Sequence, residues 1–322
     1  AGGLTDLQFE QNARQSFRDR NWFKINWNLM AIHVKYKISN KTYLNSRTFG
    51  LLASRSALGF LGSLIRIEDV YRDLIIGEYA NIGNETRLLH KYAIKNQDAA
   101  FLIGFRAYRG HTISQQGNAD STNNQDFNYL EKDKPNKSSY TTPSENFSLF
   151  TENLFHITDH FTITPGVRLE YIHTVSNGFY NQYYTDKAGN ILETNIKENN
   201  KEKTRLIPLY GLGASYKLSD SSETVRNEVY ANVTKNYRGL TFSDLRIVNG
   251  SMDIDENLQD ETGFTADFGL KGQYRQYIKY NFTLFYLWYN DKIGVIINEK
   301  NARSLRTNVG NAQMTGLESV SY

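Results

Sequence analysis

Arginine is the residue type whose placement in this sequence points most clearly to chemistry. A guanidinium group donates two parallel hydrogen bonds to a carboxylate, so a group of arginines suits a small anion that carries several carboxylates. Solvated arginines, or arginines that bind phosphate groups, are the open alternatives. Our candidate ligand-binding residues are the nine arginines in or beside segments that we expect to form long loops: Arg14, Arg18, Arg20, Arg66, Arg72, Arg238, Arg246, Arg303 and Arg306.

Two patterns that resemble metal sites fail on closer inspection. His156 and His160 have the spacing that lets two histidines share a helix face, but they span a predicted strand end and a turn. The segment that starts at Asp253 begins like a calcium loop. Its sixth position is Leu258 and its twelfth is Phe264, where that loop needs glycine and glutamate. We therefore expect no metal site in the chain.

Nothing in the sequence indicates catalysis or a cofactor. Gly211 and Gly213 lie inside a predicted strand with no helix after them, so they do not form a dinucleotide-binding turn. No serine, histidine and acid are selected by their spacing, and the sequence holds no cysteine for thiol chemistry. The net charge of +3 is too small to indicate nucleic acid. We expect no enzyme activity, no cofactor and no nucleic-acid partner.

The segments that position the arginines alternate strictly between apolar and polar residues, which predicts β-strands with one apolar face. The organising stretch is 228–272, where two alternating runs flank the polar loop 238–258. We also expect Arg168 and Glu170 to share the polar face of one strand. A further apolar face runs through five alternate residues: Tyr280, Phe282, Leu284, Tyr286 and Trp288.

About eleven long strands are predicted, and short connections alternate with long ones between them. The 22 tyrosines and 18 phenylalanines suit strands and membrane interfaces. Each strand is long enough for the ~9–11 residues that cross a bilayer at a tilt, whereas no window holds the ~20 apolar residues of a membrane helix. The predicted strands are 21–38, 42–56, 74–94, 99–113, 144–157, 161–175, 204–218, 225–237, 259–272, 277–291 and a last one after 305.

This pattern predicts an all-β fold, a partial antiparallel transmembrane β-barrel with short periplasmic turns and long extracellular loops. A soluble sandwich would mix its loop lengths and use strands of ~5–6 residues. At a finer level, we expect residues 1–20 to form a loop and a bulge to interrupt the third strand at Gly83 and Asn84.

Four segments resemble the TonB-dependent outer-membrane transporters. The family's late-barrel signature is similar to YRGLTFSDL followed by ENLQDETGFTADFGLKG. Two further strands of the family are similar to FTITPGVRLEY and RTNVGNAQMTGLE, and its ferric dicitrate branch is similar to GGLTDLQFEQNARQSFRDRNWFKINW. The resemblance covers essentially the whole chain.

The resemblance implies a place in the outer membrane of a Gram-negative bacterium and uptake of a ferric chelate, ferric dicitrate or a related siderophore. Iron would enter only as part of that chelate. Barrels of this kind have about 22 strands around a plug. We therefore expect 1–322 to be an internal part of the barrel domain, without plug or signal peptide, that supplies wall and ligand-binding loops. The resemblance also implies that Arg168 and Glu170 face the lumen and contact the plug.

The expected partners are the ferric chelate, outer-membrane lipid and lipopolysaccharide, and the TonB complex through the absent plug. Four alternatives remain open: a passive porin, TonB-dependent uptake of a carbohydrate or cobalamin, an outer-membrane enzyme on a barrel scaffold, and a soluble β-rich adhesin or carbohydrate-binding module.

Overall fold

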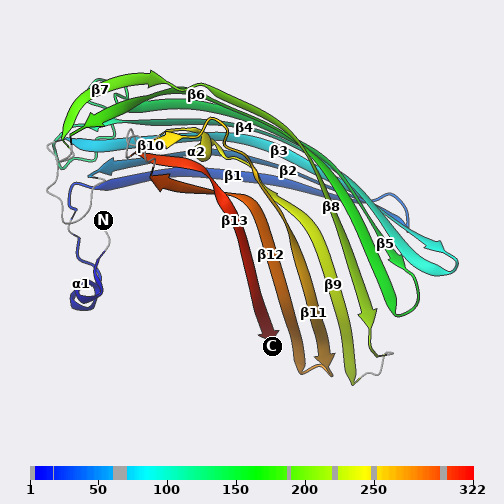
Figure 1. Ribbon diagram of the computed structural model, residues 1–322. Coiled ribbons are helices and arrows are strands. Elements are labelled where there is room, and N and C mark those ends of the chain that lie inside the picture. Colours follow the sequence, from blue (N-terminus) through cyan, green and yellow to red (C-terminus); the bar gives the residue numbers. More distant parts are fainter. Residues whose placement is uncertain are drawn as a thin grey trace.

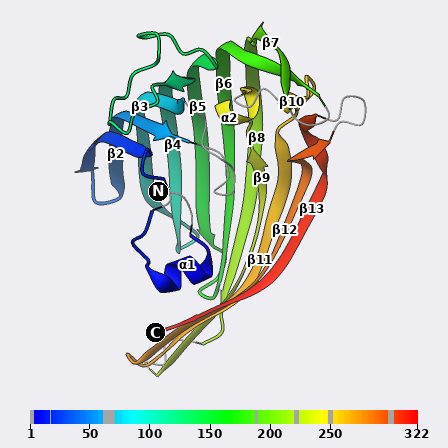
Figure 2. The same ribbon diagram turned by 90° about the vertical axis from the view of Figure 1, so that its left-hand side faces the viewer.

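One curved antiparallel sheet makes up most of the protein (Figures 1 and 2). The structure is a computed structural model that describes residues 4–16, 18–60, 71–186, 190–219, 224–247, 252–297 and 303–322. The long strands follow one another around the wall: β1 (Trp22–Lys37), β2 (Thr42–Gly59), β3 (Arg72–Ile94), β4 (Gln97–Ala119), β5 (Ser138–His156), β6 (Phe161–Thr185), β8 (Lys201–Lys217), β9 (Val225–Arg238), β11 (Glu261–Tyr274), β12 (Ile278–Ile297) and β13 (Ser304–Ser321).

The remaining elements are short and lie at the end of the wall where the long loops are. They are α1 (Asp6–Gln11), β7 (Ile191–Glu198), α2 (Phe242–Leu245) and β10 (Met252–Ile254). β7 pairs with β6, and β10 pairs in parallel with the start of β13. In the described residues the sheet does not close, because β1 pairs with β2 alone. The predicted all-β fold and partial barrel, with about eleven long strands, are confirmed.

Several strands continue beyond their predicted ends into the long loops. β4 and β5 take up both ends of the predicted loop 114–142, and β12 extends through Ile297. The predicted loop 176–201 is a hairpin of β6 and β7. Both faces of a strand are solvated beyond a membrane, so the strict alternation of apolar and polar residues ends there. The added ends of β4 and β5 are mostly polar, and 294–297 of β12 is apolar without alternation, so neither pattern predicts a strand.

Two local expectations were wrong. Residues 1–20 are not all loop, because Thr5 starts helix α1 with a capping box in which its backbone N–H donates to Gln8 Oε1 at 2.9 Å. The third strand has no bulge: Gly83 pairs in regular register with Phe49 on one side and Tyr108 on the other. A Cβ atom on Gly83 would lie 2.5 Å from the Phe49 ring, so this glycine makes room for an aromatic ring.

Gly104 on β4 provides a test of this ring-over-glycine packing. It pairs with Phe150, whose ring occupies the place of a Cβ atom. Since the ring must leave, we expect Gly104→Val to cost about 1–3 kcal/mol of folding free energy, measured by urea unfolding of the complete protein in lipid vesicles. Gly166→Val is the matched control, because the nearest atom to a Cβ there is 3.7 Å away. Equal losses from both changes would contradict the packing.

The register divides the wall into two faces, since directly paired residues share a face. The loop that carries α2 lies over the concave face (Figure 2) and is bound there by Arg205 of β8. The convex face is the apolar one. Phe268, Leu284 and Leu317 lie side by side on it, with 58%, 51% and 72% of their surfaces exposed. The sequence prediction of an apolar outer face on 280–288 agrees with this arrangement.

Candidate functional site

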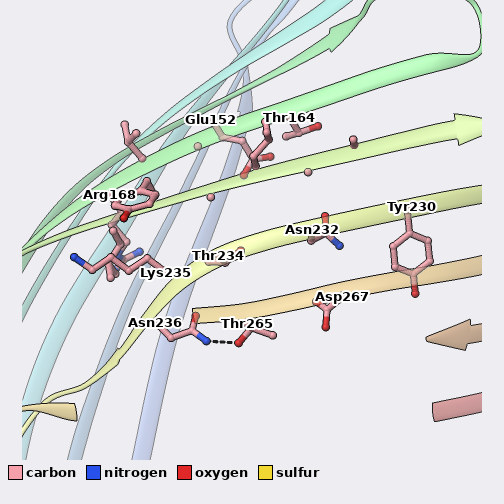
Figure 3. Close-up of a pocket in the computed structure, with 18 of the residues that line it drawn as sticks. Glu152, Thr164, Arg168, Tyr230, Asn232, Thr234, Lys235, Asn236, Thr265 and Asp267 are labelled. Atoms are coloured by element: carbon pink, nitrogen blue, oxygen red, sulfur yellow. Dashed lines mark hydrogen bonds between the residues drawn. The ribbon is translucent and has the colours of Figure 1, made fainter. Parts of the chain in front are cut away.

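The concave face holds a polar trough with a volume of about 1440 Å³. Figure 3 shows side chains of β9 and β11 that line it, among them Asn232, Thr234 and Asp267, with a hydrogen bond between Asn236 and Thr265. On β9 and β11, hydroxyl, amide and carboxylate groups therefore stand where the convex face carries apolar side chains, and Phe150, Leu209 and Leu287 also line the trough. The trough is a hydrated wall and not a dry core.

The loop between β9 and β11 is folded into this concave side and carries a small hydrophobic core of its own. Tyr140 of β5 supplies the base, and its hydroxyl accepts hydrogen bonds from the Ile247 backbone N–H at 3.3 Å and from Asn199 Nδ2 at 3.2 Å. Because the core joins wall and loop, the loop has a fixed place over the trough. The core consists of Tyr140, Tyr180, Leu240, Leu245, Ile247, Ile254 and Leu258.

A buried arginine on β8 holds both ends of this loop. Arg205 Nη1 pairs with Asp260 Oδ1 at 3.0 Å and donates to the Leu240 carbonyl at 3.2 Å, while its Nη2 donates to Thr174 Oγ1 at 2.7 Å. Asp260 also accepts the Leu240 backbone N–H at 2.7 Å. The adjacent Lys203 donates to the Leu258 carbonyl at 2.8 Å. The loop is thus fastened to the inner wall at its first and last residues.

A second anchor lies across the top of β9, β11 and β12. Glu261 is almost fully buried and accepts from Lys292 at 2.8 Å, from the Ile293 backbone N–H at 3.0 Å and from Arg238 at 3.3 Å. Arg238 also pairs with Asp244 of α2 at 3.1 Å. Burial alone would raise the pKa of Asp244, but hydrogen bonds from Thr241 and the charge of Arg238 outweigh burial and hold that pKa below its usual value.

The predicted arginines separate into two groups. On the N-terminal side, Arg72 is fully buried and binds Asp120 and the Asn124 carbonyl, the latter at 2.6 Å. Arg20 donates to the Ser121 carbonyl at 3.2 Å in the same loop. The buried Arg18 stacks 4.7 Å above the Phe60 ring, Arg14 lies exposed after α1, and Arg66 lies outside the described residues.

The second group surrounds the loop between β9 and β11. Arg303 pairs with Asp253 at 3.0 Å and Arg306 donates to the Ser243 carbonyl. Arg246 follows α2, and burial lowers its pKa. The fold therefore brings four of the predicted arginines close to the loop between β9 and β11: Arg238, Arg246, Arg303 and Arg306. Arg20 and Arg72 instead contact the loop between β4 and β5.

Arg168 and Glu170 lie on the concave face of β6, as predicted. Arg168 Nε donates to Glu170 at 2.6 Å, and the Tyr237 hydroxyl donates to the other oxygen of the same carboxylate. Glu170 therefore already has partners within the wall. The contact with a plug domain stays a prediction.

The rejected metal patterns have ordinary roles in the structure. His156 Nδ1 hydrogen-bonds Thr162 at 2.8 Å, and the carboxylates of Asp253 and Asp255 turn to different partners, Arg303 and Thr307. Within the described ranges, no three histidine, aspartate or glutamate side chains lie close enough together to hold a metal ion.

Sequence reasoning missed Arg205, Asp260 and Glu261, which hold the loop in place. The signal that could have indicated Arg205 is a charged residue on the polar face of an alternating strand, here the strand that contains KTRLIPLY. Nothing in the sequence told which residue it would meet, because the partners are 55 positions apart.

Long meandering strands, an apolar convex face, a polar trough and loops gathered at one end define a segment of a large β-barrel wall. The family model described as TonB dependent receptor-like, beta-barrel matches residues 1–322, and the chain belongs to this family. Members of the family are outer-membrane proteins of Gram-negative bacteria. The helices in the described residues are all too short or too polar to cross a membrane.

Solved structures of several receptors share this fold. The unliganded ferric citrate transporter FecA has 19% sequence identity and a TM-score of 0.73, over 99% of this chain and 42% of its own. The ferric-catecholate import receptor Fiu from E. coli K12 has 13% identity and a TM-score of 0.68, over 94% of this chain and 45% of its own. The ferric yersiniabactin uptake receptor FyuA from Yersinia pestis has 15% identity and a TM-score of 0.65, over 94% and 40%.

The chain therefore spans less than half the length of these receptors. At such identities the likeness shows the fold alone. No curated protein matches the sequence.

Proposed function

We propose that the chain is wall and loops of an outer-membrane receptor that takes up an iron chelate, ferric dicitrate or a related siderophore, with energy from the TonB complex acting through a plug domain. Membership of the receptor family carries the proposal. The polar trough beneath a loop that is held by ion pairs supports it, because a hydrated path below a mouth suits a water-soluble ligand.

The arginines divide between two roles in this proposal. Arg72, Arg238 and Arg303 each pair with a carboxylate of the chain itself, so we assign them to holding loops. Contacts with a carboxylate-rich chelate would then come from arginines around the mouth such as Arg306, whose guanidinium group donates to a neutral carbonyl, that of Ser243. The convex face would lie against lipid, with lipopolysaccharide around its outer end.

Growth with ferric citrate as the sole iron source tests the substrate. We expect deletion of the complete gene to abolish this growth, and the complete gene on a plasmid to restore it only in cells with an intact TonB complex. The TonB requirement distinguishes the receptor from a passive porin, which needs none. Unchanged growth on ferric citrate, with growth lost on another chelate, a carbohydrate or cobalamin, would replace ferric dicitrate by that substrate.

A further inference from the structure

A small hollow lies at the end of the wall where β9 begins and β11 turns into β12 (Figure 1). Arg226 and Gln273, which line it, are direct register partners. They continue the face on which Glu228 and Lys271 line the trough, so the hollow lies on the concave side, at the short-turn end of the trough. We call it the basic hollow; its volume is about 420 Å³, and its lining consists of Thr224, Arg226, Gln273, Arg275, Gln276 and Tyr277.

Two arginines of the basic hollow have no counter-ion among the described residues. Neither the Arg226 nor the Arg275 guanidinium group forms an ion pair or a hydrogen bond there, and Arg275 Cζ contacts only the Tyr274 ring, at 5.7 Å. Lys279 adds a third positive charge on the same face, because it pairs in register with Gln273.

The acid that could neutralise this charge from within the wall is already engaged. Glu228 lies two positions from Arg226 on the same face, but its carboxylate pairs with Lys271 at 3.2 Å. Asp220 and Glu223 precede Thr224 in the chain and lie outside the described residues, so they are not counted. In the described part of the chain the basic hollow therefore presents three uncompensated positive charges.

The backbone fixes Arg275 at the rim of the hollow. Its N–H donates to the Thr224 carbonyl at 2.7 Å, and its carbonyl accepts from Gln273 Nε2 at 2.7 Å. Its φ of 47° lies in the left-handed region, which glycine or asparagine occupies with less strain. Strained residues of this kind are concentrated at ligand sites, where a contact made by the side chain offsets the strain.

A small anion with several carboxylates matches the basic hollow in charge and in size. Each guanidinium group can donate two parallel hydrogen bonds to a carboxylate, and Lys279 supplies a third cation near them. Gln276 and Thr224 add uncharged polar groups. The volume falls in the range of about 300–1,000 Å³ that is usual for small-molecule sites. The hydrated trough gives a water-soluble anion a route to this position.

We propose that the basic hollow binds a small polycarboxylate such as citrate as it leaves the trough. The proposal rests on the proposed function in two respects, the carboxylate-rich cargo and the position of the short turns on the periplasmic side.

Protection of single arginines from phenylglyoxal tests the site in the complete protein in detergent micelles. Peptide mass spectrometry gives the rate of modification at each arginine. At ten times its dissociation constant, citrate is expected to slow modification of Arg226 and Arg275 about 10-fold and to leave Arg47 unaffected. Arg47 of β2 is the matched control, because it is likewise exposed near a short turn but does not line the hollow.

Two outcomes of this measurement overturn the proposal. Absence of protection at about 10 mM citrate, a concentration that would fill even a weak site, removes the site. Equal protection by sulfate reduces it to a general anion site without preference for carboxylates. Tricarballylate, which keeps the three carboxylates of citrate and lacks the hydroxyl, is expected to protect as citrate does.

Arg226→Gln with Arg275→Gln tests the role of the hollow in transport. Cells with this double variant are expected to bind radioactive ferric citrate on ice as before and to import it about 3- to 10-fold more slowly, as the loss of hydrogen bonds to a bound ligand predicts. Arg47→Gln is expected to import at the unaltered rate. Unchanged import in the double variant, or loss of binding together with import, contradicts a role at the exit of the trough.

The two measurements separate failure of this site from failure of the proposed function. If the complete gene gives neither binding of ferric citrate nor growth on it, the proposed function fails, and protection of Arg226 and Arg275 still decides whether the hollow binds polycarboxylates. If ferric citrate is imported and neither arginine is protected, the site is wrong while the proposed function stands.

Discussion

Arginine in place of Leu284 is expected to cost the barrel about 2–4 kcal/mol of folding free energy. Leu284 lies near the middle of the convex face of β12, directly between Phe268 on β11 and Leu317 on β13. All three side chains are more than half exposed, so a guanidinium group at this position would enter hydrocarbon instead of water. Neither of the two register partners carries a carboxylate with which it could pair.

Leu287→Arg on the same strand is the matched control. Leu287 lies on the concave face and lines the trough, so the same substitution keeps its charge in water. We expect a cost of about 1 kcal/mol or less, because lumen positions of such barrels tolerate charge. Urea unfolding of the complete protein in lipid vesicles measures both. Equal costs, or a larger cost at Leu287, would show that the two faces have been assigned the wrong way round.

The contrast between these two leucines also shows what the sequence can predict. Strict alternation along β12 is enough to identify its outer face, because lipid on one side and water on the other impose opposite demands on neighbouring residues. That demand ends where the strand leaves the membrane. The outer half of β6 and all of β7 mix polar and apolar residues on both faces without strict alternation, so their pairing could not be distinguished from a solvated loop.

The candidate site was less predictable for a related reason. Loop position alone selected the arginines, and a loop was assumed to expose its charges. The loop between β9 and β11 instead folds inward, and Arg238 and Arg303 pair with acids of the same chain. Whether two such side chains meet depends on where each strand ends and on which strand it pairs with. The register that joins Arg205 to Asp260 emerges only once β8, β9 and β11 are assembled.

Loss of the Arg205 side chain is expected to release the loop from the wall. In Arg205→Ala the Asp260 carboxylate and the Leu240 carbonyl lose a charged donor in a site where the two partners of the ion pair are only 6% and 15% exposed. Breaking a buried ion pair by removing one partner costs about 3–5 kcal/mol, since the remaining charge stays desolvated. Because Arg205 reaches the loop and β6 but is one strand removed from β11, we expect this loss to open the loop locally while the barrel stays folded.

Limited proteolysis of the complete protein in intact outer membranes measures that opening as new cleavage within 239–260. The double variant Arg205→Met with Asp260→Leu is the control, because replacing both partners with apolar residues leaves no unpaired charge and is expected to restore protection. Cleavage in both variants would mean that the charge pair itself is needed to place the loop. If both variants stay protected, the contacts that hold the loop are those of the Tyr140 core and the Glu261 anchor. The loop would then need no contact with β8 to stay over the trough.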